Sequence, residues 1–161
     1  MKASTTFQRA LLSLSHPLSI AAIAVVLLND HLLRHVWPSW FTGKIGDFAW
    51  LIFAPFLLAA LAGWLPIRSS NRDNLIGQGS IVAVGLIFGL AKTVPEFHSL
   101  TIKILETLTG WPNVLRIDPT DLLTLPALFI AVWIWRQSVA RTFRLPNRGL
   151  VLLPLAILAT M

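Results

Sequence analysis

The stretch LIFAPFLLAALAGWLP, from Leu51 to Pro66, carries no charged side chain and decides the fold class. With its flanks it forms an apolar segment from Asp47 to about Ile67. An α-helix of about 20 such residues crosses the roughly 30 Å hydrocarbon core of a bilayer. The whole chain has the same character, being 55% hydrophobic and 12% charged with a mean hydropathy of +0.72. Soluble domains average about 25% charged residues, so the sequence predicts an all-α integral membrane protein.

Five hydrophobic segments predict a polytopic membrane helix bundle within a single transmembrane domain, residues 1–161. The third segment contains several Gly and Ser residues, which let helix backbones approach closely, so we expect it in the bundle interior. The last has only 13 residues, about 20 Å of helix, and both a full span and a half-span are open. The segments lie at about residues 18–36, 47–67, 75–94, 119–136 and 149–161.

Two shorter helices are expected at the membrane surfaces. Apolar residues at helical spacing between Phe97 and Leu108, with charged residues on another face, predict an amphipathic helix at about 96–110. Such a helix lies in the interface plane, here over the outer end of the bundle. Residues 5–16 predict a similar short helix on the cytoplasmic surface, ended by Pro17.

The distribution of basic residues predicts the orientation. Eight of the 13 Lys and Arg residues fall on the side of the N-terminus and five on the other, which places the N-terminus in the cytoplasm. The first group is Lys2, Arg9, Arg68, Arg72, Arg136, Arg141, Arg144 and Arg148; the second is Arg34, Lys44, Lys92, Lys103 and Arg116. No small-residue cleavage site follows the first apolar run, so we expect an uncleaved first helix.

The acidic residues of the apolar segments all fall at the outer membrane face. Carboxylates at the edge of hydrocarbon are costly unless they are paired or hydrated, so we expect Asp47, Asp118 and Asp121 to converge with the cations Lys92 and Arg116. Two interpretations are open. Asp47 and Asp118 cap helices, and the cations close an ion-paired lid; or the same groups form a catalytic or ion-binding site, which needs one unpaired carboxylate with a shifted pKa.

Polar residues at the end of the first segment offer a second candidate site. Asp30 and Arg34 are four residues apart and pair on a helix, and His31 and His35 share one face at a spacing that suits zinc. Two histidines do not complete a zinc site, and no Glu follows the first as in HExxH. An outer helical turn that hydrogen-bonds its neighbours, with the histidines as interfacial anchors, explains the pattern better.

Several functional classes find no support in the sequence. Without Cys there is no disulfide, thiolate metal site or cysteine nucleophile. No phosphate-binding loop, no Ser-His-Asp pattern with familiar flanks and no nucleic-acid module is present, and no cofactor is predicted. The net charge of +6 resides largely in loops, where it reads as a topology signal and as contacts to anionic lipid.

Two motifs carry a family resemblance. Gly43-Lys44-Ile45-Gly46-Asp47-Phe48-Ala49 and Asp118-Pro119-Thr120-Asp121-Leu122 resemble the Gly-Lys-x-x-Asp-Phe-Ala and Asp-Pro-Thr-Asp-Leu signatures of a family of small bacterial multi-pass membrane proteins. That family has no established activity, and the likeness covers about residues 17–136. It implies the bacterial inner (cytoplasmic) membrane. More distantly the layout resembles that of VanZ-like proteins. In those proteins a charged residue opens one helix, an acidic residue closes the next, and an Arg…Asp stretch begins another. The residues of this chain at the corresponding places are Lys44/Asp47, then Lys92 or Glu96, then Arg116/Asp118/Asp121.

Three functions are therefore carried forward. The first is a non-enzymatic accessory or stabilising subunit of a bacterial membrane assembly, whose partners are the bilayer and other subunits or further copies. The second is a VanZ-like envelope protein that binds a lipid-linked or amphiphilic ligand in an extracytoplasmic cleft. The third is an intramembrane hydrolase or metal protein that uses His31, His35 and the aspartates.

Overall fold

The computed structural model describes residues 5–33, 36–37, 39–64, 70–109, 117–140 and 147–159, and this part of the chain is helical without a strand. The all-α prediction is confirmed. In chain order the elements are α1 (Thr6–Leu14), α2 (Pro17–Leu28), the π-helical turn η1 (Asn29–Leu33), α4 (Trp40–Trp64), α5 (Ser70–Thr93), α6 (Pro95–Thr109), the 3-10 helix η2 (Pro119–Thr124), α7 (Ala127–Ala140) and α8 (Asn147–Leu158).

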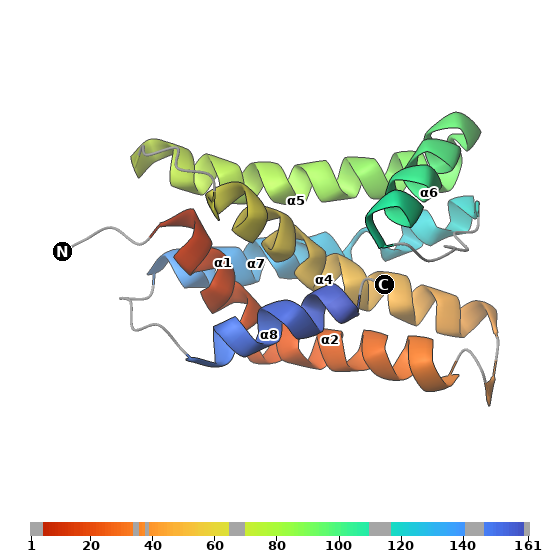
Figure 1. Ribbon diagram of the computed structural model, residues 1–161, viewed down its shortest axis with the longest axis horizontal. Coiled ribbons are helices and arrows are strands. Elements are labelled where there is room, and N and C mark those ends of the chain that lie inside the picture. Colours follow the sequence, from red (N-terminus) through yellow and green to blue (C-terminus); the bar gives the residue numbers. More distant parts are fainter. Residues whose placement is uncertain are drawn as a thin grey trace.

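Helix α4 is the central element of the bundle. It packs against α1, α2, α5 and α7, and Figure 1 shows it running between α5 on one side and α2 with α8 on the other. Its side chains Leu51, Phe53 and Phe56 are fully buried. Within the apolar windows of the two long helices, 56% of the α4 residues are buried but only 33% of those in α5. The expectation that the third segment occupies the interior was therefore wrong. The second segment, α4, takes the central position, and α5 packs at its side.

Two glycines of α5 lie against the neighbouring helix α7. A Cβ atom added at Gly77 would lie 1.9 Å from Cζ2 of Trp135, and one at Gly85 would lie 2.7 Å from Leu128 Cδ1. Both contacts are with α7, so the missing side chains let α5 and α7 pack closely together. The Trp135 indole that fills the space beside Gly77 is buried and donates a hydrogen bond to Asn74 Oδ1 at 3.2 Å.

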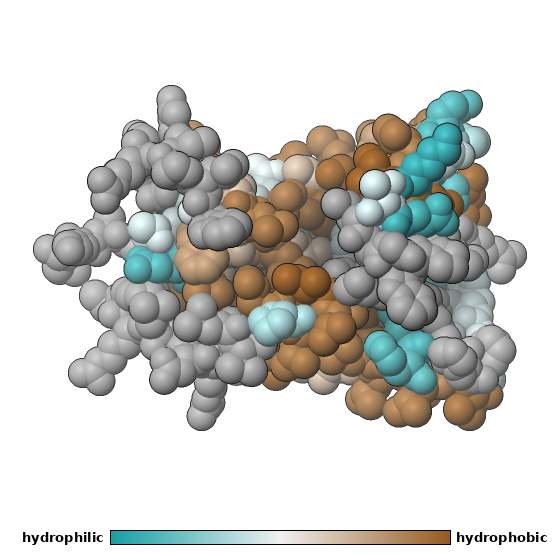
Figure 2. Space-filling model, viewed as in Figure 1, coloured by the Kyte–Doolittle hydropathy of each residue, from teal (hydrophilic) through white to brown (hydrophobic). Residues whose placement is uncertain are grey.

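Fewer helices than expected have the dimensions of a membrane span. Within the described residues, Trp40–Gly63 and Asn74–Thr93 are long and apolar enough to cross a membrane, and a third span results if α1 and α2 with η1 count as one broken helix. The fourth and fifth segments contain only the 14-residue α7 and the 12-residue α8. Figure 2 shows an apolar surface across the middle of the molecule, with hydrophilic residues at the end that carries α6.

The N-terminal helix belongs to the bundle. Thr5 and Gln8 form a reciprocal capping box at the start of α1, and the helix ends before Pro17 as expected. However, Ala10, Leu11 and Leu14 are fully buried, and α1 contacts α4, α7 and α8. The axes of α1 and the following helix are bent by 65°. The prediction of a surface helix over residues 5–16 was wrong, because the bend turns α1 into the core.

Candidate functional site

The site begins with the N-terminus of α4, which lies seven residues before the expected one. The Ser39 hydroxyl accepts a hydrogen bond from the Thr42 amide at 3.2 Å, and the Thr42 hydroxyl accepts one from the Ser39 amide at 3.1 Å. This reciprocal cap starts the helix at Trp40. Asp47 is therefore two turns inside α4, about 10 Å along its axis, and does not cap it. Trp40, Lys44 and Asp47 follow helical spacing and share one face.

The second part of the site is the motif Asp-Pro-Thr-Asp, which folds as expected at a helix start. The Asp118 carboxylate caps η2 by accepting the Thr120 amide at 2.9 Å, and Pro119 takes the first helical position. Asp121 lies in the first turn and is buried. The predicted fourth helix is divided here, because η2 ends at Thr124 and α7 begins only at Ala127, after Pro126. Pro126 thus separates two helices, whereas Pro55 lies inside α4.

Asp121 stands at the centre of an ion-pair network of five side chains. Its Oδ2 accepts a hydrogen bond from Lys92 Nζ at 2.6 Å, and its Oδ1 accepts one from Lys44 Nζ. Lys92 also pairs with Asp47 at 3.0 Å, and Lys44 with Asp118 at 3.1 Å. The network, here called the lysine–aspartate cluster, consists of Lys44, Asp47, Lys92, Asp118 and Asp121. It joins α4, the last turn of α5 and η2.

Thr120 completes the outer side of the lysine–aspartate cluster. Its hydroxyl accepts a hydrogen bond from Lys44 Nζ at 2.6 Å and donates one to Asp118 Oδ1 at 2.6 Å. The Trp40 indole N–H points to the same hydroxyl at 3.4 Å, and the Lys44 ammonium lies 5.0 Å from the Trp40 ring centroid. The hydroxyl and the amide of Thr120, followed by Lys44, lower the pKa of Asp118 to about 2. Asp118 is thus ionised at neutral pH.

The carboxylates of the cluster are all engaged in ion pairs. Lys92 and Asp121 are buried, and all three aspartates of the cluster are paired with a lysine. Each oxygen of the Asp121 carboxylate accepts a hydrogen bond from a lysine, which is the geometry of the ion-paired lid. Buried charges that are fully paired do hold the elements that carry them in a fixed relation.

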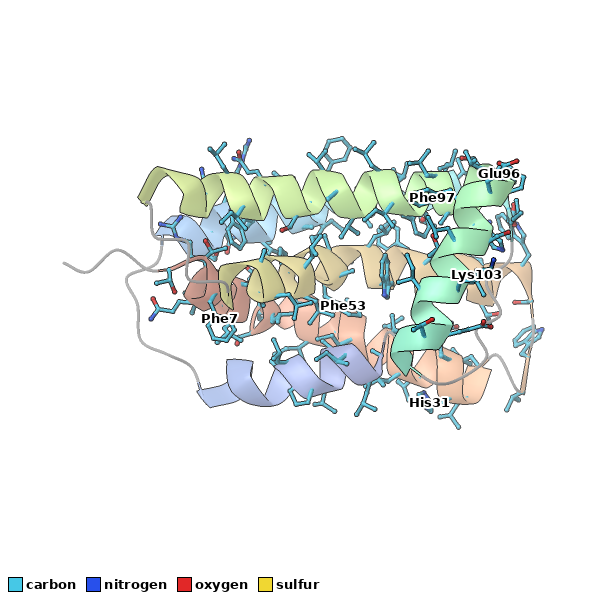
Figure 3. The ribbon with its side chains drawn as sticks, turned by 45° about the horizontal axis from the view of Figure 1, so that its top comes forward. Phe7, His31, Phe53, Glu96, Phe97 and Lys103 are labelled. Atoms are coloured by element: carbon cyan, nitrogen blue, oxygen red, sulfur yellow. The ribbon has the colours of Figure 1, made fainter. Side chains whose placement is uncertain are left out.

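Helix α6 covers the end of the bundle beside the cluster. It follows α5 directly, and His98 Nδ1 lies 2.9 Å from the carbonyl oxygen of Ala91 in the last turn of α5. Figure 3 shows α6 crossing the end of the bundle, with Glu96 and Lys103 on it. The predicted helix at about 96–110 is thus observed at Pro95–Thr109, while its position in a membrane interface stays a prediction. Leu100 and Ile104 are half exposed on its surface.

The candidate residues of the first segment lie in η1, at the same end of the bundle. Asn29 Nδ2 donates to Asp30 Oδ1 at 3.0 Å, and His31 Nδ1 lies 3.0 Å from the Leu27 carbonyl oxygen. The hydrogen bonds described for Asp30 and His31 are therefore with residues of the same continuous helix. Their predicted partners Arg34 and His35, and the predicted cluster cation Arg116, lie outside the described residues. The described part of the chain holds no group of three His, Cys, Asp or Glu residues that could bind a metal.

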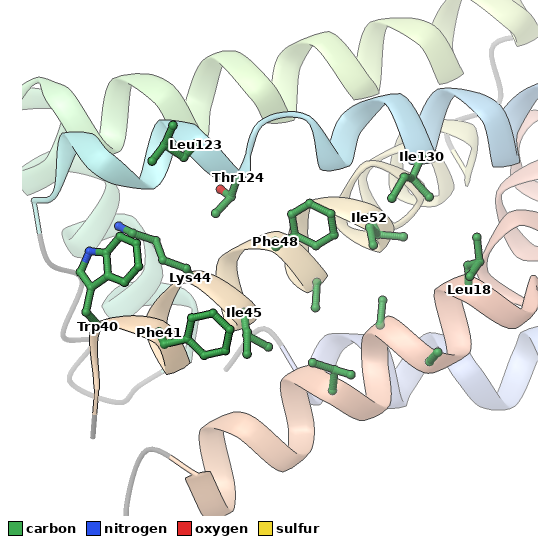
Figure 4. Close-up of a pocket in the computed structure, with 14 residues that line it drawn as sticks. Leu18, Trp40, Phe41, Lys44, Ile45, Phe48, Ile52, Leu123, Thr124 and Ile130 are labelled. Atoms are coloured by element: carbon green, nitrogen blue, oxygen red, sulfur yellow. The ribbon is translucent and has the colours of Figure 1, made fainter. Parts of the chain in front are cut away.

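An apolar groove of about 560 Å³ runs beside the lysine–aspartate cluster. Figure 4 shows its walls, which come from α2, α4 and the η2–α7 segment. Trp40, Lys44 and Thr124 contribute to one end of the groove, and Leu18 and Ile52 lie toward the other. Its volume falls within the roughly 300–1,000 Å³ that is usual for small-molecule sites.

Sequence reasoning missed two features of the site. It counted Lys44 among the candidate polar residues but named only Lys92 or Arg116 as the partner of Asp121, because it started the helix at Asp47. The signal was present: Ser39 and Thr42 form a capping pattern, and a helix from Trp40 places Lys44 and Asp47 on one face. Thr120 was read as part of a helix start, and its hydroxyl bonds to Lys44 and Asp118 have no signature in a single sequence.

No family model, curated protein or solved structure matches this chain. The family resemblance of the two motifs accordingly stays a prediction.

Proposed function

We propose that the protein is a non-enzymatic integral membrane protein that serves as an accessory or stabilising subunit of a bacterial membrane assembly. The observation that carries the proposal is the pairing of every carboxylate in the lysine–aspartate cluster. In this arrangement the polar groups at the outer end are used to hold α4, α5 and η2 together. They act as a structural closure of the bundle and not as reacting groups.

The outward face of α5 supports the part of the proposal that concerns a partner. Leu75, Val82 and Leu86 are each at least 60% exposed, and Gly79 lies on the same helical stripe with no atom within 4 Å of an added Cβ. An apolar stripe interrupted by a glycine permits close approach of a second transmembrane helix. The other glycines described in α5 face α7 or η2, so Gly79 is the one that is left for a partner in this part of the helix.

The proposal includes a topology. All five hydrophobic segments are embedded in the bacterial inner membrane, with the N-terminus in the cytoplasm and the lysine–aspartate cluster at the outer face. The short α7 and α8 then cross only part of the bilayer. The bias of Lys and Arg toward the N-terminal side supports this orientation.

The test is native co-purification of the full chain from membranes in mild detergent, followed by native mass spectrometry. Gly79→Leu places a branched side chain in the α5 stripe, and Gly43→Leu is the matched control because an added Cβ there also meets nothing within 4 Å. We expect a stoichiometric partner that is lost with Gly79→Leu and retained with Gly43→Leu. A monomer without a partner, or a partner that survives Gly79→Leu, contradicts the proposal.

A further inference from the structure

The groove beside the lysine–aspartate cluster has the shape of a chain-binding site. Along α4 its lining runs from Trp40 to Ile52, which corresponds to about 18 Å of helix. Its lining includes the buried small residues Ala22 and Ala49, and Figure 4 shows lining side chains spaced along α2 and α4. Phe48 and Val25 on its rim are more than one-third exposed, so the groove is open along its side.

The polar groups that reach the groove are already used within the protein. Lys44 Nζ donates to Asp118, Thr120 and Asp121, which accounts for the three hydrogens of an ammonium group. The Thr124 hydroxyl donates to the Asp121 carbonyl oxygen at 2.6 Å. The remaining lining residues are apolar. An occupant is therefore recognised through apolar contact, and hydrogen bonds to the groove walls contribute little to its selection.

We infer that the groove binds one long acyl chain of a membrane lipid, with the lipid headgroup at the end formed by Trp40 and Phe41 and the chain end toward Leu18 and Ile52. The source is the surrounding bilayer, because α4 has the length and apolar character of a membrane span and the open side of a groove on such a helix faces hydrocarbon. Trp40 and Phe41 are more than 60% exposed, as is common for aromatic side chains at the level of lipid headgroups.

The groove selects its occupant by acyl-chain length. Binding depends on the length of the acyl chain, because each methylene that leaves the bulk lipid contacts the groove wall. It depends little on the headgroup, since the N–H groups of Lys44 and the O–H of Thr124 are already donated within the protein. This binding is independent of the proposed assembly partner, whose surface lies on α5 and not on α2 or α4.

The experiment uses the full chain in nanodiscs that contain phosphatidylglycerol or phosphatidylethanolamine with a photoreactive diazirine at the end of a long acyl chain. Cross-linked residues are mapped by mass spectrometry. Ala21→Trp fills the groove, because Ala21 lines it from the exposed side of α2. Ala24→Trp is the matched control, since Ala24 is also exposed on α2 but is not part of the lining. Thermal unfolding of both variants shows whether each retains the fold.

We expect labelling to concentrate near Leu18 and Ile52 with either headgroup. It should fall about tenfold with Ala21→Trp, which corresponds to about 1.4 kcal/mol, and stay unchanged with Ala24→Trp. Shortening the acyl chain should also reduce it. Labelling that is spread evenly over the exposed helices, that survives Ala21→Trp or that follows the headgroup rather than the chain would overturn the inference.

Discussion

Replacement of Gly77 by Ala probes the contact that sets the distance between α5 and α7. The new Cβ would lie 1.9 Å from Cζ2 and 2.1 Å from Cε2 of Trp135. Carbon atoms attract each other at about 3.5–4.0 Å, so the indole or the helix must move by about 1.5–2 Å. The ring has little freedom to do so, because Trp135 is 1% exposed and stacks on Phe56 with ring centroids 6.4 Å apart.

The expected loss of stability follows from three contributions. Overpacking of a filled core costs about 1–3 kcal/mol, and a displaced indole weakens its hydrogen bond to Asn74, which is worth about 1 kcal/mol. In the opposite direction, the higher helix propensity of Ala than of Gly raises the free energy of unfolding by up to about 1 kcal/mol. We therefore expect Gly77→Ala to lower the free energy of unfolding by about 1–3 kcal/mol.

The assay is unfolding by sodium dodecyl sulfate in mixed micelles, followed by tryptophan fluorescence. Gly79→Ala is the control on the same helix, because an added Cβ there meets open space, and it should cause no loss. Equal free energies of unfolding for the two variants, within about 0.5 kcal/mol, would refute the close packing of α5 on α7.

Two further predictions concern the caps of α4 and η2. The pKa of Asp118 is about 2 in the folded protein against about 3.9 in an unfolded chain, so its stabilising effect is present above about pH 4 and is lost as the pH falls toward 2. The difference in melting temperature between wild type and Asp118→Asn should shrink across that interval, and a constant difference would be contrary to the assignment. Ser39→Ala removes the acceptor of the Thr42 amide and should cost about 1 kcal/mol; an unchanged unfolding midpoint would contradict a helix start at Trp40.

The sequence predicted the fold class and the membership of the polar site well, because both depend on composition and on local pattern. The long apolar run after Asp47 is visible in the sequence itself. So are the positions of the polar residues at segment ends that share one side of the predicted bundle: Asp47, Asp118 and Asp121 at the start of a segment and Lys92 at the end of one. Four of the five residues that we expected to converge do meet, and Lys44 joins them. The fifth, Arg116, lies outside the described residues. The helical elements themselves also follow from capping residues such as Thr5 and Asp118.

Tertiary packing decided what the sequence left undetermined. The small residues of α5 suggested a central helix, but a glycine signals close approach without saying on how many sides, and here Gly77 and Gly85 serve one neighbour. The helix over residues 6–14 has the amphipathic pattern of a surface helix. Its apolar face is buried against α4 instead, because a 65° bend returns it to the bundle. Neither outcome has a signature in hydrophobic periodicity.

The groove between α2, α4 and α7 was also beyond sequence reasoning. Its lining residues are ordinary apolar side chains, and nothing in their order distinguishes them from residues that face lipid. The cavity lies where side chains of α2, α4 and the η2–α7 segment come together, and these segments are far apart in the sequence. A cleft at the outer face was expected, but its walls and its position beside Lys44 could only come from the structure.

The central claim is that the lysine–aspartate cluster is a structural closure, and the energetic coupling between Lys92 and Asp121 tests it most directly. A double-mutant cycle with Lys92→Met and Asp121→Asn, measured by unfolding in mixed micelles, isolates the interaction of these two side chains. Each single substitution leaves the charge of its buried partner without one of its counter-charges, and should lower the free energy of unfolding by about 3–5 kcal/mol. The cycle should give a coupling energy of about 1–3 kcal/mol between the two side chains. Single substitutions that leave the free energy of unfolding unchanged, with effects that add within about 0.5 kcal/mol, would contradict the account.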